Sequence, residues 1–413
     1  MILSFSLLLD ASEMGVLSKI KDNMISFNNT EIAFKSKSDK ELKWAQTLFS
    51  MIGSNALVSV GKFMSRVALK LSLPVAWAVK PTIYNYFVGG ESINDCQENV
   101  RLLQKFGVKA ILDYSVEGGD SLEDFNKAMT ETLKTIHNAA KDDNVPFAVF
   151  KPTAFTKEVV LEKVSAGKKL TKEEEKEAAD FRERVATLCK TAYDNDVPIL
   201  IDAEDVAYQN FIDEVVYANM EMFNKKKAIV FNTYQMYRWD RLGKLEEAFN
   251  NAVEKGYYLG AKFVRGAYME KERARAQEHG YKDPIQPDKD STDRDYNAAL
   301  KFCIERIDRI SIFNGTHNEY SSRYMTELME KHSIKKDDPR CWFSQLFGMS
   351  DHISFNLAYS GYNVSKYVPF GPVKSVLPYL IRRTEENTSI AGQTGRELSL
   401  IKTEMARRKK SSN

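Results

Sequence analysis

Eight short apolar runs, each followed by an amphipathic stretch, recur along the chain from Ala110 onward. The runs are too short for helices, and they are rich in β-branched and aromatic residues, as strands buried on both faces should be. Eight strand–helix units in succession predict an α/β fold, a closed and somewhat distorted (βα)8 barrel of the TIM type. The runs are ILDYSV (111–116), PFAVFKPT (146–153), PILIDAE (198–204), AIVFNTY (228–234), YLGAKFVRGAY (258–268), SIFNGTHN (311–318), RCWFSQLFG (340–348) and NVSKYVPFG (363–371).

The stretches between the runs have helical patterns, and TKEEEKEAADFRERVATLCKTAYDN (171–195) is a clear example. Thr171 and Glu174 fit a capping box at its start. The apolar residues that recur on one of its faces are Phe181, Val185, Leu188 and Ala192. An open doubly wound sheet is the competing fold, but no GxGxxG or GxxxxGK(S/T) loop follows the first run, which weakens the nucleotide-binding form of that alternative.

Composition and charge indicate which binding partners and which cellular compartment to expect for this protein. The 413 residues carry 59 Lys and Arg against 57 Asp and Glu, a net charge of +2, so nucleic acid is not expected as a partner. Four widely spaced cysteines form no CxxC pair, so we expect no disulfide framework, no metal site and a reducing, cytoplasmic location. The apolar start, MILSFSLLLD, is too short to span a bilayer. We interpret it as a packing segment, and an unusual signal peptide is the alternative.

The pattern divides the chain into three parts: a helical arm (1–106), the barrel (107–397) and a basic tail (398–413) that contains ARRKK (406–410). Within the arm, residues 55–80 place Lys62, Arg66 and Lys70 on one stripe of an apolar helix. Two interpretations stay open. The helix packs on the barrel with a solvated basic face, or it makes a peripheral contact with the inner face of an anionic membrane.

Polar side chains lie among the last residues of nearly every run or directly after it. Because the loops after the strands of a barrel surround one mouth, we expect these side chains to converge on one site. A single polar side chain of this kind is typical of a solvated strand end. Its recurrence at nearly all eight strand ends favours a functional site. They are Glu117, Lys151, Asp202, Glu204, Gln235, the segment Lys262–Tyr268, His317, Gln345 and Tyr367.

After the last run, YLIRRTEENTS (379–389) places Arg382, Arg383 and Glu386 on one helix face. An isolated RRxxE is more typical of an exposed, salt-bridged surface. In the mouth of a barrel, paired guanidinium groups can instead grip a carboxylate or a phosphate, because their planar forks match its oxygens.

Several long segments together resemble proline dehydrogenase over roughly residues 100–395. They resemble the monofunctional, mitochondrial-type enzymes more closely than the proline-oxidising domain of bifunctional proline utilisation A. The resemblance implies a flavin-bearing barrel that oxidises L-proline to Δ1-pyrroline-5-carboxylate and passes electrons to a quinone. The segments are IDAED (201–205), FNTYQMY (231–237), KFVRGAYMEKERARA (262–276), THNEYSS (316–322), QLFGMSDHISF (345–355) and YVPFGPVKSVLPYLIRRTEENTS (367–389).

The resemblance also implies a substrate site. Arg382 and Arg383 should hold the proline carboxylate, the anion that the oxidation leaves untouched and that can orient the ring. Lys151 corresponds to a lysine that meets the same carboxylate, and Glu117 to a glutamate that pairs with the first arginine. Glu386 is also expected among the residues of the substrate site. The positions that correspond to the pocket wall over the ring are Tyr268, Leu346 and Tyr367.

Tyr367 bears on the choice between related substrates. Hydroxyproline-preferring members of the family have a smaller residue at this position, and a tyrosine leaves little room for a ring hydroxyl. Tyr367 thus favours proline as the substrate. A preference for hydroxyproline is the alternative within the family. Outside it, the alternatives are an enzyme that uses Lys151 or Lys262 to form a Schiff base and a non-catalytic barrel that binds an acidic metabolite.

For the cofactor, the resemblance implies FAD, and because no motif marks a flavinylated histidine we expect it to be held noncovalently. Lys262 corresponds to the position beside flavin N5, where many bacterial relatives carry arginine, and Asp202 should support the catalytic lysines. Gln235 should hydrogen-bond the edge of the flavin ring. His317 alone would be typical of a core histidine, but here it should reach the ribityl or phosphate region with Thr316. Ala203 and the backbone around Val264, Arg265, Gly266 and Ala267 should line the cofactor.

Overall fold

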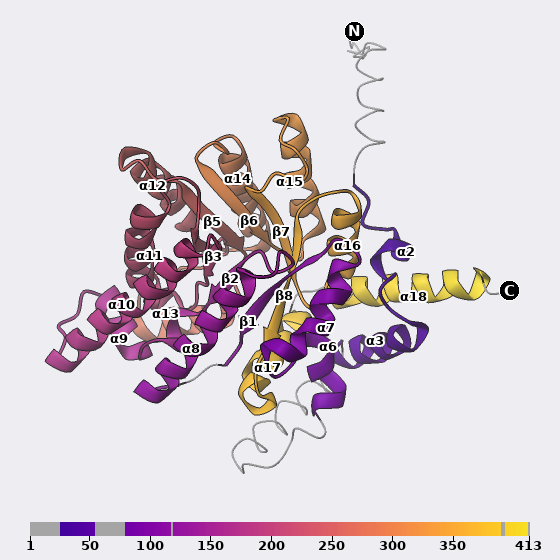
Figure 1. The fold of residues 1–413 in the computed structure, drawn as a ribbon, viewed down its shortest axis with the longest axis horizontal. Helices are drawn as coiled ribbons and strands as arrows, with labels where there is room; N and C mark the ends of the chain where they lie inside the picture. The colour runs from indigo at the N-terminus through magenta and orange to yellow at the C-terminus, as the bar shows by residue number, and fades with distance from the viewer. Residues whose placement is uncertain (1–24, 54–78, 117–118, 390–392, 412–413) are drawn as a thin grey trace, which may run out of the picture.

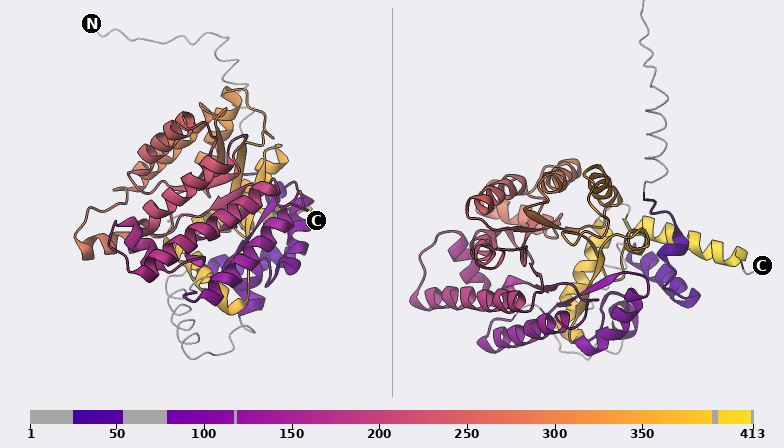
Figure 2. Two further views of the ribbon diagram at one scale, coloured as in Figure 1. Left: turned by 60° about the vertical axis from the view of Figure 1, so that its left-hand side comes forward. Right: turned by 45° about the horizontal axis from the view of Figure 1, so that its top comes forward.

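The computed structural model describes residues 25–53, 79–116, 119–389 and 393–411, apart from the side chains of residues 384–389 and 393 (Figure 1). Eight parallel strands form a barrel surrounded by helices (Figure 2). Each predicted run overlaps one strand, so the (βα)8 architecture is confirmed. The strands are β1 (Lys109–Tyr114), β2 (Ala148–Phe150), β3 (Ile199–Ile201), β4 (Val230–Gln235), β5 (Leu259–Val264), β6 (Ile310–Gly315), β7 (Cys341–Leu346) and β8 (Val364–Phe370).

The barrel is nearly closed. Hydrogen-bonded ladders run in the order β1-β8-β7-β6-β5-β4-β3-β2, and within the described residues no ladder joins β1 to β2. Two other contacts cross this seam. The backbone N–H of Ala110 donates to the carbonyl of Asn144 over 2.8 Å, and Lys151 Nζ lies 2.8 Å from Asp113 Oδ2. A side-chain ion pair therefore takes part in closing the barrel next to its mouth.

Helices follow the strands as the pattern predicts. The predicted capping box is present: the Thr171 side chain accepts from Glu174 N, and α10 starts at the next residue. The predicted apolar face of α10 is buried. The helices after the strands are α8 (Leu122–Ala139), α9 (Glu158–Ser165), α10 (Lys172–Asp194), α11 (Gln209–Phe223), α12 (Arg241–Glu254), α13 (Met269–His279), α14 (Lys289–Ile304), α15 (Glu319–Lys331), α16 (Asp351–Tyr359), α17 (Val373–Ser389) and α18 (Gln393–Ser411).

Aromatic side chains fill the inside of the barrel below its mouth. Phe147, just before β2, makes edge-to-face contacts with Phe231, Phe313 and Trp342, with ring centroids 5.2–5.8 Å apart. Leu200 and Ile111 belong to the same buried cluster. This plug leaves the carboxyl ends of the strands as the place where a cavity can form.

The described part of the predicted arm is mostly helical. Its elements are α2 (Thr30–Ala33), α3 (Asp39–Ile52), a π-helix (Lys80–Tyr84), α6 (Asn85–Phe87) and α7 (Ile93–Gln104). α7 packs on the outside of β1, and its Cys96, Val100 and Leu103 join the main core. The basic stripe of Lys62, Arg66 and Lys70 lies outside the described residues.

The last helix, α18, lies beside α3 on one side of the barrel (Figure 1). Leu400 and Ile401 of α18 pack with apolar residues of α2 and α3. The predicted boundary at residue 398 thus falls inside a helix, and Arg408 of the basic cluster pairs with Glu404 and Asp39. The three-part division of the chain stays a prediction.

Candidate active site

A cavity of about 610 Å³ lies at the carboxyl ends of the strands. Polar residues from the carboxyl-terminal parts of different strands and from the segments after them converge there, as predicted for the mouth of a barrel. Every predicted site residue lines this cavity except Glu117 and Glu386. Glu117 lies outside the described residues, and Glu386 lies in α17 with its side chain outside them.

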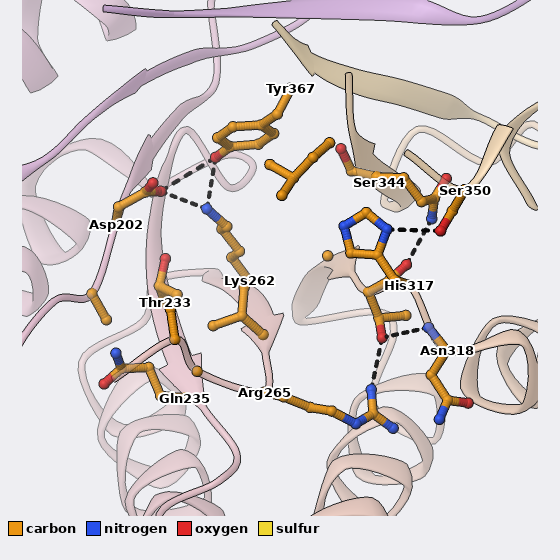
Figure 3. A pocket seen from close by; sticks show the side chains of 18 of the residues that line it. Asp202, Thr233, Gln235, Lys262, Arg265, His317, Asn318, Ser344, Ser350 and Tyr367 are labelled. Atoms are coloured by element: carbon orange, nitrogen blue, oxygen red, sulfur yellow. Dashed lines mark hydrogen bonds and ion pairs between the residues drawn. The ribbon is translucent and has the colours of Figure 1, made fainter. Parts of the chain in front are cut away.

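Lys262, Asp202 and Tyr367 form a hydrogen-bonded triad in the cavity (Figure 3). Lys262 Nζ lies 2.5 Å from Asp202 Oδ1 and donates to Tyr367 Oη over 2.7 Å, and Tyr367 Oη donates to the same carboxylate over 3.2 Å. Burial lowers the pKa of Lys262, and the Asp202 carboxylate opposes that effect. The triad joins β5, β8 and the residue after β3, so it fixes a cation above the aromatic plug.

A second buried ion pair lies at the barrel seam. Lys151 Nζ donates to both oxygens of Asp113, over 2.8 and 3.0 Å, and Ser115 Oγ donates to the same carboxylate over 2.6 Å. Burial alone would raise the pKa of Asp113, but the Lys151 ammonium, the Ser115 hydroxyl and the Lys262 cation together outweigh burial, and the pKa lies below its usual value. The sequence analysis missed Asp113. Its signal is a carboxylate inside the apolar run ILDYSV, which is costly to bury without a partner.

Arg382 and Arg383 lie on α17 and both line the cavity. Arg383 is 8% exposed, and its guanidinium lies 5.0 Å from the centre of the Tyr379 ring. Pro378 lies inside α17, four residues before Arg382. Two adjacent guanidinium groups and the Lys151 ammonium thus line the same cavity, which suits a small carboxylate.

The opposite wall carries polar groups from β4 and the segments after β5 and β6. Gln235 Nε2 donates to the carbonyl of Glu204 over 2.8 Å, while its buried Oε1 has no hydrogen-bond partner among the described residues. Arg265 Nη1 donates to Thr316 Oγ1 over 2.7 Å, and its Nη2 lies 2.7 Å from Asp293. The Arg265 side chain, and not only its backbone, therefore contributes to this wall.

Gly266 connects β5 to this wall with a φ of +123°. A Cβ atom at this position would lie 2.5 Å from the Tyr237 ring. Both the backbone conformation and this close approach require glycine. The structure therefore explains the glycine by protein packing, while its approach to a cofactor stays a prediction.

His317 lies beyond Thr316, after β6, and its Nδ1 lies 2.9 Å from Ser350 Oγ (Figure 3). Burial and the nearby Lys366 and Arg383 cations lower the pKa of His317 to about 3. The imidazole is therefore neutral at neutral pH. Ser350, His352 and Arg396 also line the cavity. The sequence analysis named none of them as a site residue, although Ser350 and His352 lie in the segment 345–355 that carries the family resemblance.

The sequence model of the family described as proline dehydrogenase matches residues 96–396. The mitochondrial proline dehydrogenase 1 of Dictyostelium discoideum is 32% identical, over 96% of this chain and 77% of that protein. The carbapenem antibiotics biosynthesis protein CarD of Pectobacterium carotovorum is 35% identical over 79% of this chain and 84% of that protein. The hydroxyproline dehydrogenase of Xenopus laevis is 30% identical over 93% of this chain and 90% of that protein.

Among solved structures, proline utilisation A of Bdellovibrio bacteriovorus, inactivated by N-propargylglycine, superposes with a TM-score of 0.69. It is 19% identical and covers 92% of this chain, which spans 41% of that longer protein. At this identity the likeness supports the barrel fold alone. The family match, together with relatives that align along most of their own length, shows that the chain belongs to the proline dehydrogenase family.

Proposed function

We propose that this protein is a flavoenzyme that oxidises L-proline to Δ1-pyrroline-5-carboxylate, with FAD as its cofactor and a quinone as its electron acceptor. Membership of the proline dehydrogenase family supports the reaction and a flavin. The observation that carries the proposal for this chain is a single cavity that brings Arg382, Arg383 and Lys151 together with the Lys262–Asp202 pair. Three cations for a carboxylate and a fixed cation nearby are what this reaction needs.

The donor set of the cavity fits a flavin. Gln235 Oε1 is a buried acceptor without a partner among the described residues, and a flavin ring edge offers an N–H to such a group. Beyond it, Arg265, Lys289 and the neutral His317 line the cavity and suit the ribityl and phosphate oxygens. A flavin bound there would supply a hydride acceptor. The absence of any motif for covalent attachment supports noncovalent binding.

The residues of the chain have separate tasks in this proposal. Arg382, Arg383 and Lys151 hold the substrate carboxylate and so fix which ring carbon faces the hydride acceptor. Asp202 and Tyr367 hold the Lys262 ammonium in place, where it would stabilise the negative charge that a bound flavin gains when it accepts the hydride, while the substrate gains the positive charge. Tyr367 also occupies the space that a hydroxyl group on the substrate ring would need.

A membrane contact and the location of the protein are further proposals. None of the helices in the described part of the chain combines the length and apolar character of a membrane span. We propose a cytoplasmic location with peripheral binding through Lys62, Arg66 and Lys70. The mitochondrion is the alternative that the name of the Dictyostelium relative raises. Sedimentation with anionic and neutral vesicles tests the contact: salt-sensitive binding that a variant without these three charges loses would support it, and no binding under any condition would contradict it.

The reaction itself is tested with a quinone-like dye. The purified, flavin-loaded protein should reduce the dye when L-proline is added, and much more slowly with trans-4-hydroxy-L-proline or an acyclic amino acid. Faster dye reduction with hydroxyproline would support the alternative within the family. A flavin-loaded protein that reduces the dye with none of them would contradict the proposed function.

A further inference from the structure

Ser350 has an unusual conformation for the residue at the start of a helix. It is the N-cap of α16, but its backbone is left-handed, with φ +50° and ψ +43°, and its side chain makes no capping hydrogen bond. A serine N-cap ordinarily has an extended backbone, and its hydroxyl accepts from its own helix. Here the residue is 1% exposed, and its hydroxyl lies 2.9 Å from His317 Nδ1 in the cavity. The left-handed backbone therefore turns the hydroxyl to His317.

Glu397 of α18 holds Ser350 in this position. Its Oε1 accepts the backbone N–H of Ser350. Glu397 is 3% exposed, and burying a carboxyl group is costly unless hydrogen bonds or ion pairs compensate for the lost water, as the Ser350 N–H does here. Burial raises the pKa of Glu397, and its other ionisable neighbours are His352, whose Nδ1 lies 3.9 Å away, Asp351 and Lys366. Glu397 lies one residue past the end of the family match, in a helix, α18, that begins inside it.

The hydrogen bond between Ser350 and His317 selects one tautomer of the imidazole. Among the described residues, His317 Nδ1 is the one hydrogen-bond partner found for Ser350 Oγ. If Nδ1 carried a hydrogen, the buried hydroxyl would have no acceptor for its own, which costs the desolvation of that group. The favourable arrangement has Ser350 donating to a bare Nδ1. Because the imidazole is neutral, its hydrogen then lies on Nε2.

We infer that Glu397 and Ser350 are positioning residues that fix His317 as the Nε2–H tautomer, so that this N–H is presented as a donor to an oxygen of the bound flavin. Figure 3 shows the second ring nitrogen of His317 on the side away from Ser350, facing the open space of the cavity. The inference rests on the proposed function for the identity of the ligand. The tautomer itself depends on the protein contacts alone.

Nitrogen NMR of the flavin-loaded protein labelled with 15N-histidine tests this. The chain has only five histidines, and a His317→Gln variant assigns the signals of His317. In the wild type we expect Nε2 to be the protonated nitrogen and Nδ1 the bare one. Ser350→Gly removes the hydroxyl but suits the left-handed backbone, so it should fold, lose the tautomer preference and bind FAD about tenfold more weakly.

Variants of α18 separate positioning from simple stabilisation. Glu397→Ala should shift the tautomer populations and weaken FAD binding, whereas Glu397→Gln keeps an acceptor for Ser350 N and should restore both. Glu404→Ala removes another buried glutamate of the same helix, one that pairs with Arg407 and Arg408, and is the matched control. It should lower thermal stability and leave the tautomer and FAD affinity unchanged.

A hydrogen on Nδ1 in the wild type would overturn the inference. It would also be overturned if Ser350→Gly and Glu397→Ala left both the tautomer populations of His317 and the FAD affinity unchanged. The same holds if Glu404→Ala changed these two quantities as much as Glu397→Ala does. These readouts do not involve proline. A protein that shows the Nε2–H tautomer and binds FAD but does not oxidise proline would contradict the proposed function and leave the positioning role intact.

Discussion

Lys262 Nζ and Asp202 Oδ1 lie 2.5 Å apart, and this pair joins β5 to the end of β3 at the floor of the cavity. Burial lowers the pKa of Lys262, while Asp202 acts in the opposite direction. Removing Asp202 should therefore lower that pKa further. If the charged lysine is the active form, activity is present below its pKa and lost as the pH rises through it. The alkaline limb of the pH–rate profile for proline oxidation should thus move to lower pH in Asp202→Ala, and an unmoved limb would show that the pair does not control the reaction.

The two arginines of α17 should act on the substrate and not on the cofactor. Arg382→Met and Arg383→Met each remove a charge-assisted contact to the carboxylate, which costs on the order of 2–5 kcal/mol. We expect kcat/KM for proline to fall accordingly, while the flavin content per protein stays near that of the wild type. Unchanged proline kinetics in both variants would exclude these arginines from the substrate site.

The hydroxyl group of Tyr367 and the size of its side chain should have separate effects on the reaction. Tyr367→Phe loses the hydrogen bonds to Lys262 and Asp202 but keeps the ring, so proline oxidation should slow with little change in substrate preference. Tyr367→Ser also opens space and should raise the ratio of kcat/KM for hydroxyproline to that for proline. Equal ratios in the wild type and Tyr367→Ser would show that another residue selects against the ring hydroxyl.

Gly266 should not tolerate a side chain. In Gly266→Ala the new Cβ would meet the Tyr237 ring at 2.5 Å, in a backbone conformation that L-residues rarely adopt. The loop after β5 must shift, and we expect a loss of about 1–3 kcal/mol in unfolding free energy together with weaker FAD binding. Gly243→Ala is the control, because no atom of the described residues lies within 4 Å of its added Cβ. A variant at Gly266 as stable as that control would contradict the packing argument.

His317 should make the flavin-free protein sensitive to mild acid. Its pKa is about 3 in the folded chain, against 6.5 when it is unperturbed. Between these values the unfolded state binds the proton and the folded state does not, so the contribution of His317 to stability is complete above pH 6.5 and declines as the pH falls towards 3. Urea unfolding between pH 7 and 5 should show this decline in the wild type and a shallower one in His317→Gln. An equally steep decline of the unfolding free energy in the wild type and in His317→Gln would indicate that groups other than His317 cause the loss of stability in mild acid.

The sequence was sufficient to predict the strands because each is a continuous apolar run that needs burial on both faces. It also located most of the candidate site, because polar residues such as Lys151 and Gln235 lie at the ends of those runs. Asp113 was missed because it lies inside a run, where the pattern predicts an apolar side chain. Its partner, Lys151, comes from the next strand along the chain, and the pair forms only when the seam closes.

The contact between Ser350 and Glu397 could not be predicted for a different reason. The two residues are 47 positions apart, and they meet because α18 returns to the barrel and because Ser350 adopts a left-handed backbone. Local propensity favours neither feature. Likewise, the basic residues near the C-terminus gave no sign that Leu400 and Ile401 would bury one face of α18 against α3.

The most direct test of proline oxidation is an anaerobic titration of the flavin-loaded protein with L-proline, followed by visible absorbance. We expect the yellow oxidised flavin to bleach in proportion to the proline added and to regain its colour when a quinone is supplied. Acid precipitation of the same sample should release the flavin, as noncovalent binding requires. A flavin that stays oxidised with excess proline, in a protein that retains its cofactor and its fold, would contradict the proposed reaction.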